Sequence, residues 1–300
     1  MLKIAWHPSY AHPLPDGHRF PMEKYELLPE QLIHEGTISE SNLFAPSLLD
    51  EASILRVHDE EYWLKLKEQR LSRKEERRTG FPLSQQLVER EIRIMQGTVD
   101  CVDHAFEHGI AMNIAGGTHH AYTDHGEGFC LLNDLALAAR NALLQGKAKR
   151  VLFVDLDVHQ GNGSAEIFEK DESVFTFSMH GAKNYPMHKE KSDLDIPLPD
   201  GTDDNHYLSI LKETLPRLFD MVEPDLICFQ TGVDVLESDQ LGRLGMTIDG
   251  CRERDRIVLE RCHENDVPVI CAMGGGYSKD IRLIVEAHAN TFRLAQEIYF

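Results

Sequence analysis

Short apolar runs recur along the whole chain, and most are followed by a longer amphipathic segment. The runs have the length and the β-branched or aromatic content expected of buried parallel strands. They occupy residues 2–6, 111–115, 151–155, 174–178, 226–230 and 267–273. The helical patterns occupy residues 83–108, 133–145, 204–222, 249–264 and 279–299. This alternation predicts an α/β fold: a doubly wound, mostly parallel β-sheet of about eight strands with helices on both faces.

Composition narrows the class of protein. The 300 residues are 42% apolar and 27% charged, which indicates a soluble globular chain, and we expect residues 1–300 to form one domain. No apolar stretch approaches the ~20 residues that a membrane span needs, and no secretory leader opens the chain. We therefore expect a cytoplasmic protein. Its six cysteines lack C-x-x-C pairing, so we interpret them as reduced packing residues.

The charge balance bears on possible partners. The formal net charge is -19, which argues against direct binding to a nucleic-acid backbone. It favours a cationic substrate, although solubility explains the charge equally well. The most charged run, residues 65–78, is better explained as a solvated helix end and loop than as a binding patch. No loop suggests a dimer lid, so we expect a monomer.

One polar segment directly follows the apolar run at 151–154. It carries Asp155, Asp157 and His159 in alternate positions. In an extended chain alternate side chains share a face, so the three would point the same way. Carboxylates this close repel each other unless a cation or paired donors compensate them. The segment therefore predicts a metal site; the alternative is a strand followed by an ordinary polar turn.

Polar motifs also follow three other expected strands, and the carboxyl ends of parallel strands meet at one edge of a sheet. These motifs are GGTHH at 116–120, TGVD at 231–234 and GGGY at 274–277. Alone, Asp234 is typical of a helix cap or turn, but opposite Asp157 and His159 it completes a set of metal ligands. Two carboxylates and one imidazole leave positions open for water and substrate, as in catalytic zinc sites. Zn²⁺ is our hypothesis, and Fe(II), Co(II) and Mn(II) suit the same donors.

His119, His120 and Tyr277 are candidates for the chemistry beside the metal. An imidazole titrates near neutral pH, so the histidine pair can take a proton from an attacking water and return it to a leaving amine. The hydroxyl of Tyr277 can stabilise the oxyanion of a tetrahedral intermediate. The alternatives are a surface histidine pair and a glycine turn that simply precedes the last helix.

With these motifs the chain resembles the histone deacetylase family, which has the arginase/deacetylase fold. The resemblance extends from about Trp6 to the last expected helix, and Gln160, Asn162 and the LESDQLGRL stretch are most similar to the class IV branch, here a bacterial member. It rests on GGTHHA at 116–121, GFCLLNDLALA at 128–138, DLDVHQGNG at 155–163, FSMH at 177–180, GVDVLESDQLGRLGMT at 232–247 and GGGY at 274–277.

The resemblance implies a role for each matching residue. The implied zinc ligands are Asp157, His159 and Asp234. The implied catalytic residues are His120 as general base and acid, His119 as its electrostatic partner, Tyr277 on the carbonyl, and Asp155 and Asn162 behind the histidines. The implied tunnel residues are Gly128, Phe129 and Tyr185, and Leu241 is a further expected substrate contact. The implied ligands of a structural potassium ion are Asp155, Asp157, His159, Ser178 and Met179.

Asn162 occupies a position that is an aspartate in the class I branch of the family. A carboxylate partner favours imidazolium, whereas a neutral amide positions the ring without raising its pKa as much. We therefore expect His119, backed by Asp155, to be charged more often than His120. This supports His120 as the base.

The expected reaction is hydrolysis of an acetyl or longer acyl group from a lysine side chain or a similar amine, through a metal-activated water. An acetylpolyamine or another small acylated amine would also suit a tunnel that ends at a metal, and class IV resemblance favours longer acyl chains. Two further alternatives are a binuclear manganese ureohydrolase, which needs more carboxylates nearby, and a non-catalytic binder of acylated amines.

Overall fold

The computed structural model describes residues 1–300 and contains one sheet of eight strands, all parallel to their neighbours. The order across the sheet is β2-β1-β3-β8-β7-β4-β5-β6. The strands are β1 (Lys3–Ala5), β2 (Leu43–Phe44), β3 (Ile110–Asn113), β4 (Val151–Asp155), β5 (Val174–Gly181), β6 (Leu194–Leu198), β7 (Leu226–Gln230) and β8 (Val269–Ala272). The predicted fold class is confirmed.

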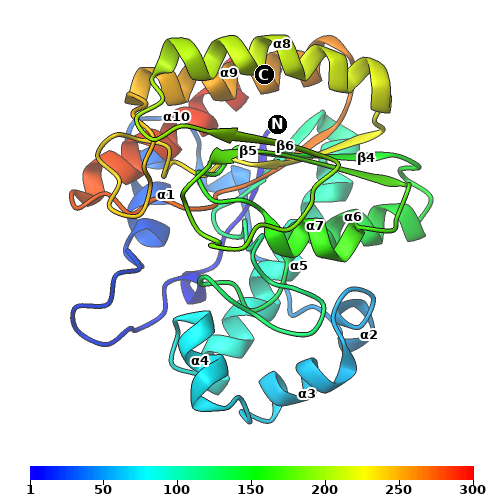
Figure 1. Ribbon diagram of the computed structural model, residues 1–300, viewed down its shortest axis with the longest axis vertical. Coiled ribbons are helices and arrows are strands. Elements are labelled where there is room, and N and C mark those ends of the chain that lie inside the picture. The colour runs from blue at the N-terminus through cyan, green and yellow to red at the C-terminus, as the bar shows by residue number, and fades with distance from the viewer.

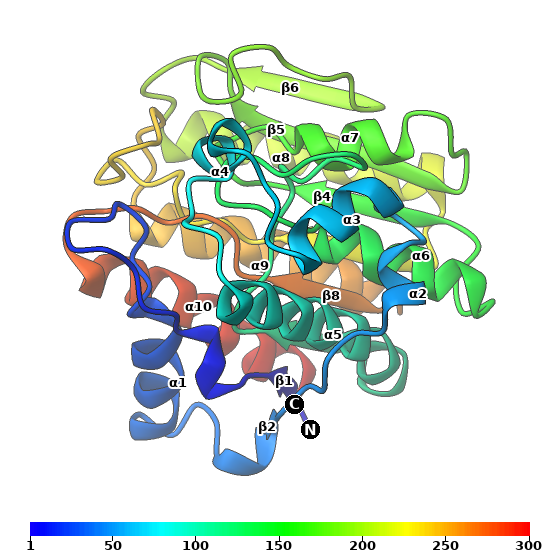
Figure 2. The ribbon, with the colours of Figure 1, turned by 90° about the horizontal axis from the view of Figure 1, so that it is seen from below.

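Helices cover both faces of this sheet (Figure 1). The α-helices are α1 (Lys24–His34), α2 (Glu51–Ile54), α3 (Glu60–Lys67), α4 (Arg73–Thr79), α5 (Gln85–His108), α6 (Asp134–Leu144), α7 (Asn162–Phe168), α8 (Asp204–Val222), α9 (Ile248–Glu264) and α10 (Ile281–Tyr299). Helices α8, α9 and α10 lie over one face, with α1 beside α10, and α5, α6 and α7 lie over the other. Figure 1 shows α3 and α4 on the side of α5 away from the sheet, and Figure 2 shows the same helices near the viewer, so they form an outer layer. No helix combines the length and the apolar character that a membrane span requires.

The sequence pattern missed the two edge strands and the short helices. β2 has only two residues, and β6 contains a proline and an aspartate that interrupt the apolar run. Short, polar or proline-containing strands are typical of sheet edges, where one side needs no partner. Helix α1 contains Pro29 and has a weak apolar stripe, and α2, α4 and α7 have fewer than eight residues each.

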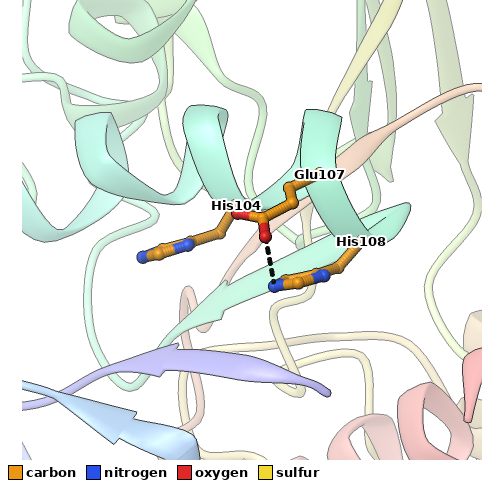
Figure 3. Close-up of side chains that lie close together, drawn as sticks. All are labelled: His104, Glu107 and His108. Atoms are coloured by element: carbon orange, nitrogen blue, oxygen red, sulfur yellow. Dashed lines mark ion pairs between the residues drawn. The ribbon is translucent and has the colours of Figure 1, made fainter.

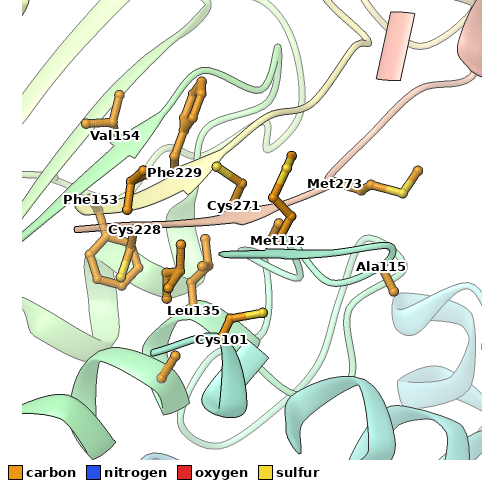
Figure 4. Close-up of a cluster of buried hydrophobic side chains, with 14 of the residues drawn as sticks. Cys101, Met112, Ala115, Leu135, Phe153, Val154, Cys228, Phe229, Cys271 and Met273 are labelled. Carbon is orange, nitrogen blue, oxygen red and sulfur yellow. The ribbon is translucent and has the colours of Figure 1, made fainter. Parts of the chain in front are cut away.

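The core forms around the central strands. Every residue of β3, β4, β7 and β8 is buried, and 79 buried apolar residues form one continuous cluster. Figure 4 shows the side chains of Cys101, Met112, Cys228 and Cys271 within it. All six cysteines are free and buried, as expected of packing residues.

The register of the strands brings their carboxyl ends to one level. Asp155 at the end of β4 pairs with Ser178 in β5 and with Gln230 at the end of β7. Gln230 in turn pairs with Ala272 at the end of β8, and Ala272 pairs with Asn113 at the end of β3. The loops that follow β3, β4, β7 and β8 therefore begin side by side, as the sequence predicted.

Candidate metal centre and active site

The loops after β4 and β7 bring Asp157, His159 and Asp234 together. Their ligand atoms all lie within 4.8 Å of one another. His159 Nδ1 is 3.1 Å from Asp157 Oδ1 and 3.1 Å from Asp234 Oδ2. The side chains are buried, with exposed fractions of 1% for Asp157, 7% for His159 and 0% for Asp234. The sequence prediction that these residues converge agrees with this geometry.

The backbone between Asp155 and His159 does not continue the strand, so the predicted extended conformation was wrong there. β4 ends at Asp155, and the carboxylates of the segment accept local backbone hydrogen bonds. Asp155 Oδ1 accepts from the amide of Asp157 at 3.2 Å, and Asp157 Oδ1 accepts from the amide of His159 at 3.0 Å. Asp234 Oδ1 accepts from the amide of Val158 at 2.9 Å. These bonds hold Asp157 and His159 beside Asp234, whereas Asp155 Oδ2 lies 2.7 Å from His119 Nδ1.

Two glycines make room for the ligands. A Cβ atom on Gly232 would lie 2.1 Å from Asp157 Oδ2, and one on Gly275 would lie 1.9 Å from Asp234 Oδ2. The amide of Gly275 also donates to Asp157 Oδ2 at 2.9 Å. Any side chain at either position would therefore displace a ligand carboxylate.

The electrostatics of this cluster favour a bound cation. Burial and the neighbouring charge of Asp157 raise the pKa of Asp234 to about 7. Although burial opposes it, Asp157 and Asp234 raise the pKa of His159 to about 10. A positive charge is therefore stabilised between the two carboxylates, where His159 Nδ1 lies. A buried set of one imidazole and two carboxylates fits a divalent transition metal with positions left open.

A second group of potential ligands, His104, Glu107 and His108, lies on one face of α5 (Figure 3). His108 Nε2 lies 3.7 Å from Glu107 Oε1, and the ring of His104 packs 4.8 Å from that of Phe44. Glu107 is exposed, and the two histidines are half-buried. Because water reaches these groups, no uncompensated buried charge requires an ion here. Of the two clusters, the buried one is the stronger candidate for a metal.

A histidine pair flanks the buried cluster. The rings of His119 and His120 lie 4.1 Å apart, in the loop after β3. His119 Nδ1 is 2.7 Å from Asp155 Oδ2, and His120 Nδ1 is 2.5 Å from Asn162 Oδ1 at the start of α7. The structure therefore places both expected partners behind the ring predicted for each.

The surroundings of Asn162 determine which nitrogen of His120 carries the proton. The Asn162 amide nitrogen donates to Glu127 Oε1 at 2.6 Å and to Tyr122 Oη at 3.0 Å. Its oxygen therefore faces His120 and accepts a hydrogen bond from Nδ1–H. The other ring nitrogen, Nε2, is then unprotonated and available as a base.

The two histidines differ in charge, in the direction the sequence predicted. Burial lowers the pKa of His119, but the carboxylates of Asp155 and Asp157 outweigh burial and raise it to about 9. Burial and the positive charges of His119 and His159 hold the pKa of His120 well below its usual range. At neutral pH His119 is therefore an imidazolium ion and His120 a neutral imidazole.

Tyr277 completes the group. Its backbone amide donates to Asp239 Oδ2 at 2.6 Å, and its ring centre lies 6.4 Å from that of His159. Burial and the charges of Asp234 and Asp157 raise the pKa of Tyr277 well above its usual range. The phenol is therefore neutral and can donate its hydroxyl proton in a hydrogen bond.

Two joined cavities give access to this site. The outer one, about 330 Å³, is lined by all four residues expected to contact the substrate: Gly128, Phe129, Tyr185 and Leu241. The inner one is only about 30 Å³ and extends past the cluster to Tyr25, Arg90 and Ile94. Both cavities are lined by His120, His159 and Tyr277, so they meet at the site.

The residues expected to bind potassium also lie close together. Asp155 pairs in register with Ser178, and Met179 follows Ser178 in β5. All five of the expected ligands are buried. The hydroxyl of Ser178 lies 3.0 Å from His180 Nδ1. The potassium ion stays a prediction.

The sequence patterns did not identify two residues that hold the loops around the site. Gln230 Nε2 donates to the carbonyl of Gly117 at 2.8 Å, which connects the loop after β3 to β7. Arg254 in α9 is fully buried and donates to the carbonyls of Leu156 and Gly232 at 3.1 and 2.6 Å. The sequence could have indicated Arg254, because it is spaced with the apolar residues that form the buried face of α9. A charged side chain on a buried face needs a polar partner.

Lys24 had no comparable signal. It lies in α1, which the sequence pattern did not predict. Its ammonium group is fully buried and donates to the carbonyl of Gly274 at 3.1 Å, and burial lowers its pKa to about 8. Lys24 thus fixes the start of the glycine loop that carries Tyr277.

Comparisons with known proteins bear on the fold and the family of this chain. A histone deacetylase domain model matches residues 18–292. An uncharacterized protein of Picosynechococcus sp. is 45% identical over 296 residues, which cover 99% of each chain. Histone deacetylase 2 of Arabidopsis thaliana is 30% identical over 286 residues, covering 92% of this chain and 74% of that one. Among solved structures, the HD domain of HDA15 aligns with a TM-score of 0.83 at 21% identity, over 96% of this chain and 89% of that chain.

The fold and the site define an α/β protein of the arginase/deacetylase fold with a buried cluster of potential metal ligands. The chain belongs to the histone deacetylase family. The resemblance seen in the sequence is therefore confirmed, and family membership supports a deacetylase, which is a hydrolase. Assignment to the class IV branch stays a prediction.

Proposed function

We propose that the protein is a zinc-dependent hydrolase that removes an acetyl group from a lysine side chain. The observation that carries this proposal is the buried cluster of Asp157, His159 and Asp234 beside a neutral His120 where the two cavities meet. These three residues would bind the ion. A bound Zn²⁺ would supply Lewis acidity for the amide carbonyl and lower the pKa of a water molecule.

The residues of the chain would move the protons. Nε2 of His120 would accept a proton from the attacking water and later donate it to the departing amine. The Nδ1–H of His120 remains bound to Asn162 Oδ1 throughout, which fixes the ring. The imidazolium of His119, paired with Asp155, would stabilise negative charge in the transition state without transferring a proton.

Tyr277 would stabilise the oxygen of the carbonyl. Its neutral hydroxyl can donate a hydrogen bond that strengthens as negative charge develops on that oxygen. Asp239 holds the backbone of this residue by accepting a hydrogen bond from its amide. This would be the main contribution of the glycine loop to catalysis.

The size and lining of the cavities suit a substrate with a narrow side chain. The alkyl chain of a lysine would lie between Phe129 and Tyr185, with Leu241 near the opening. The inner cavity of about 30 Å³ offers room for about two or three water-sized groups, which suits an acetyl group. This favours acetyl over the longer acyl chains that class IV resemblance suggested.

The structure offers less support for the alternative functions. A binuclear ureohydrolase needs further carboxylates at the cluster, but Asp155 is bound to His119 and position 162 is an amide. A non-catalytic binder would need no neutral base beside the ligands. We therefore keep the acetyl-lysine hydrolase as the proposed function.

The test is release of the matching carboxylate (acetate, hexanoate or myristate) by zinc-loaded protein. The substrates would be an acetyl-lysine peptide, matched hexanoyl- and myristoyl-lysine peptides, and acetylspermidine. We expect the acetyl-lysine peptide to have the highest kcat/KM. No turnover of any of them, with zinc bound at the cluster, would support the non-catalytic binder instead.

A further inference from the structure

Three arginines surround the opening of the outer cavity: Arg19, Arg77 and Arg78. We propose that they bind an anionic group of the substrate, so that the preferred substrate is an acetylated lysine within an acidic peptide segment. This inference rests on the proposed function and adds the chemical class of the residues that flank the lysine.

The charge at the opening is opposite to that of the whole chain. The chain has 50 acidic and 31 basic residues. Of the 12 residues that line the outer cavity, three are arginines and none is acidic. A local excess of positive charge at the opening attracts anionic ligands and repels cationic ones.

The three guanidinium groups are free to bind a ligand. All three arginines are exposed, and none of their side chains forms an ion pair or a hydrogen bond. Arg293, by contrast, is bound by the carboxylates of Glu35 and Glu286 at 2.6 Å each. The arginines at the opening therefore keep their donors available for a carboxylate or phosphate.

The backbone under these side chains is attached to the wall of the cavity. The amide of Gly128 donates to the carbonyl of Arg78 at 3.0 Å, and the amide of Phe129 donates to the carbonyl of Thr79 at 2.8 Å. From the neighbouring loop, His18 Nε2 lies 2.8 Å from the carbonyl of Gly80. The backbone that carries Arg77 and Arg78 is therefore fixed relative to the site, which lowers the cost of binding a ligand there.

Helix stability explains only part of this arrangement. Arg77 and Arg78 lie in the last turn of α4, where a cation interacts favourably with the helix dipole. Arg19 lies in a loop, outside any helix, yet lines the same opening. The acidic residues of α4 face other partners, because Glu75 pairs with Lys65 at 3.4 Å and Glu76 accepts from the amide of Leu83 at 3.4 Å. A ligand at the opening accounts for all three arginines.

The position of the arginines identifies which part of the substrate they contact. His120, His159 and Tyr277 line the inner end of the outer cavity, where the amide would be cleaved. The arginines line its outer part, so they would face the backbone and flanking side chains beyond the lysine, and not the acyl group. Flanking aspartate, glutamate or phosphorylated side chains would pair with them, whereas a polyamine would be repelled.

The experiment compares three acetyl-lysine peptides of equal length whose flanking residues are glutamate, glutamine or lysine. Zinc-loaded protein is assayed for kcat/KM, and binding of the same peptides is measured by fluorescence anisotropy with the Tyr277→Phe protein. We expect the order glutamate, glutamine, lysine, with each arginine contributing about two- to fivefold. In the double variant Arg77→Gln/Arg78→Gln the ratio between the glutamate and glutamine peptides should fall towards one. The exposed Arg73, at the other end of α4 and outside the cavity lining, gives the matched control Arg73→Gln, which should keep the ratio.

The outcomes separate this inference from the proposed function. Equal kcat/KM and equal binding for the three peptides would overturn the inference while leaving the deacetylase intact. Failure of the glutamine peptide to react would count against the proposed function, and the anisotropy order would still decide whether the opening selects acidic segments. Hydrolysis of acetylspermidine in preference to every peptide would overturn the inference.

Discussion

The inner end and the opening of the active-site cavity differ in both charge and burial. At the inner end, the carboxylates of Asp157 and Asp234 are fully enclosed and face His159. At the opening, Arg77 and Arg78 are exposed and unpaired. Buried charges interact strongly because water does not screen them, whereas exposed charges interact weakly. The inner residues should therefore control whether the reaction occurs, and the outer ones which substrate is preferred.

The largest effect should follow from removing a ligand carboxylate at the inner end. Asp157→Asn should abolish stoichiometric zinc binding and lower kcat/KM by about a thousandfold or more, because the metal contributes several kcal/mol to the transition state. Metal content by mass spectrometry and acetate release check this. The matched control is Asp220→Asn, an exposed carboxylate on α8, which should change neither quantity.

The same loss should follow from a steric change that leaves every ligand in place. In Gly275→Ala the new methyl group would lie 1.9 Å from Asp234 Oδ2, so the carboxylate must move and zinc content should fall. Conversely, His104→Gln on α5 should keep one zinc per chain, because we expect the ion at the buried cluster. Loss of zinc in the α5 variant alone would reverse this assignment.

A smaller effect is expected for the hydroxyl of Tyr277. Tyr277→Phe should retain zinc and lower kcat by about 10²- to 10³-fold, which is typical for the loss of one oxyanion donor. Parallel measurements of metal content and single-turnover rates separate the two quantities. Tyr299→Phe removes a hydroxyl that bonds to Leu259 away from the site and should have no effect on the rate. A Tyr277→Phe protein with a wild-type rate would exclude the role given to this residue.

A shift in the pH profile is expected from the charge of His119. Asp155 helps to raise the pKa of His119 to about 9, and the positive form is the one that supports catalysis. Activity should therefore fall as pH rises through this pKa. In Asp155→Asn the pKa should drop by about one to two units, so the alkaline limb of kcat/KM should move to lower pH. Ring-nitrogen NMR titration gives the same pKa independently, and an unchanged titration of His119 would contradict its pairing with Asp155.

The smallest effect is expected at the opening. Because exposed charges are screened by salt, the preference for the glutamate peptide should shrink by about two- to fivefold between low and high ionic strength. The rate on the glutamine peptide should change little over the same range. A preference that is independent of salt would show that the arginines do not act through charge.

Much of the inner end could be predicted from the sequence, because its residues follow apolar strands at fixed intervals. Asp157, His159 and Asp234 each come within a few residues of a strand end, and parallel strands bring those ends together. The extended conformation predicted between Asp155 and His159 was wrong, because local hydrogen bonds to the carboxylates end the strand at Asp155. Side-chain hydrogen bonds of this kind compete with regular structure and leave no periodic pattern.

The opening could not be predicted in the same way. Arg19, Arg77 and Arg78 come from segments about 60 residues apart, in a loop and a short helix that have no strong apolar pattern. The charged run at 65–78 was interpreted as a solvated helix end, and its side chains are indeed mostly exposed. Tertiary contacts, such as the hydrogen bond from the amide of Gly128 to the carbonyl of Arg78, bring its last residues to the cavity. The net charge of -19 likewise gave no indication of a basic opening, because it suited a cationic substrate and ordinary solubility equally well.

A zinc titration of metal-free protein tests most directly whether one zinc ion at the buried cluster is required for the reaction. Bound zinc and acetate release from the glutamine peptide are measured at each addition. Activity should rise from zero in proportion to bound zinc and saturate at one ion per chain, while Asp157→Asn should stay inactive. Full activity of the metal-free protein, or saturation only at two ions per chain, would contradict this requirement.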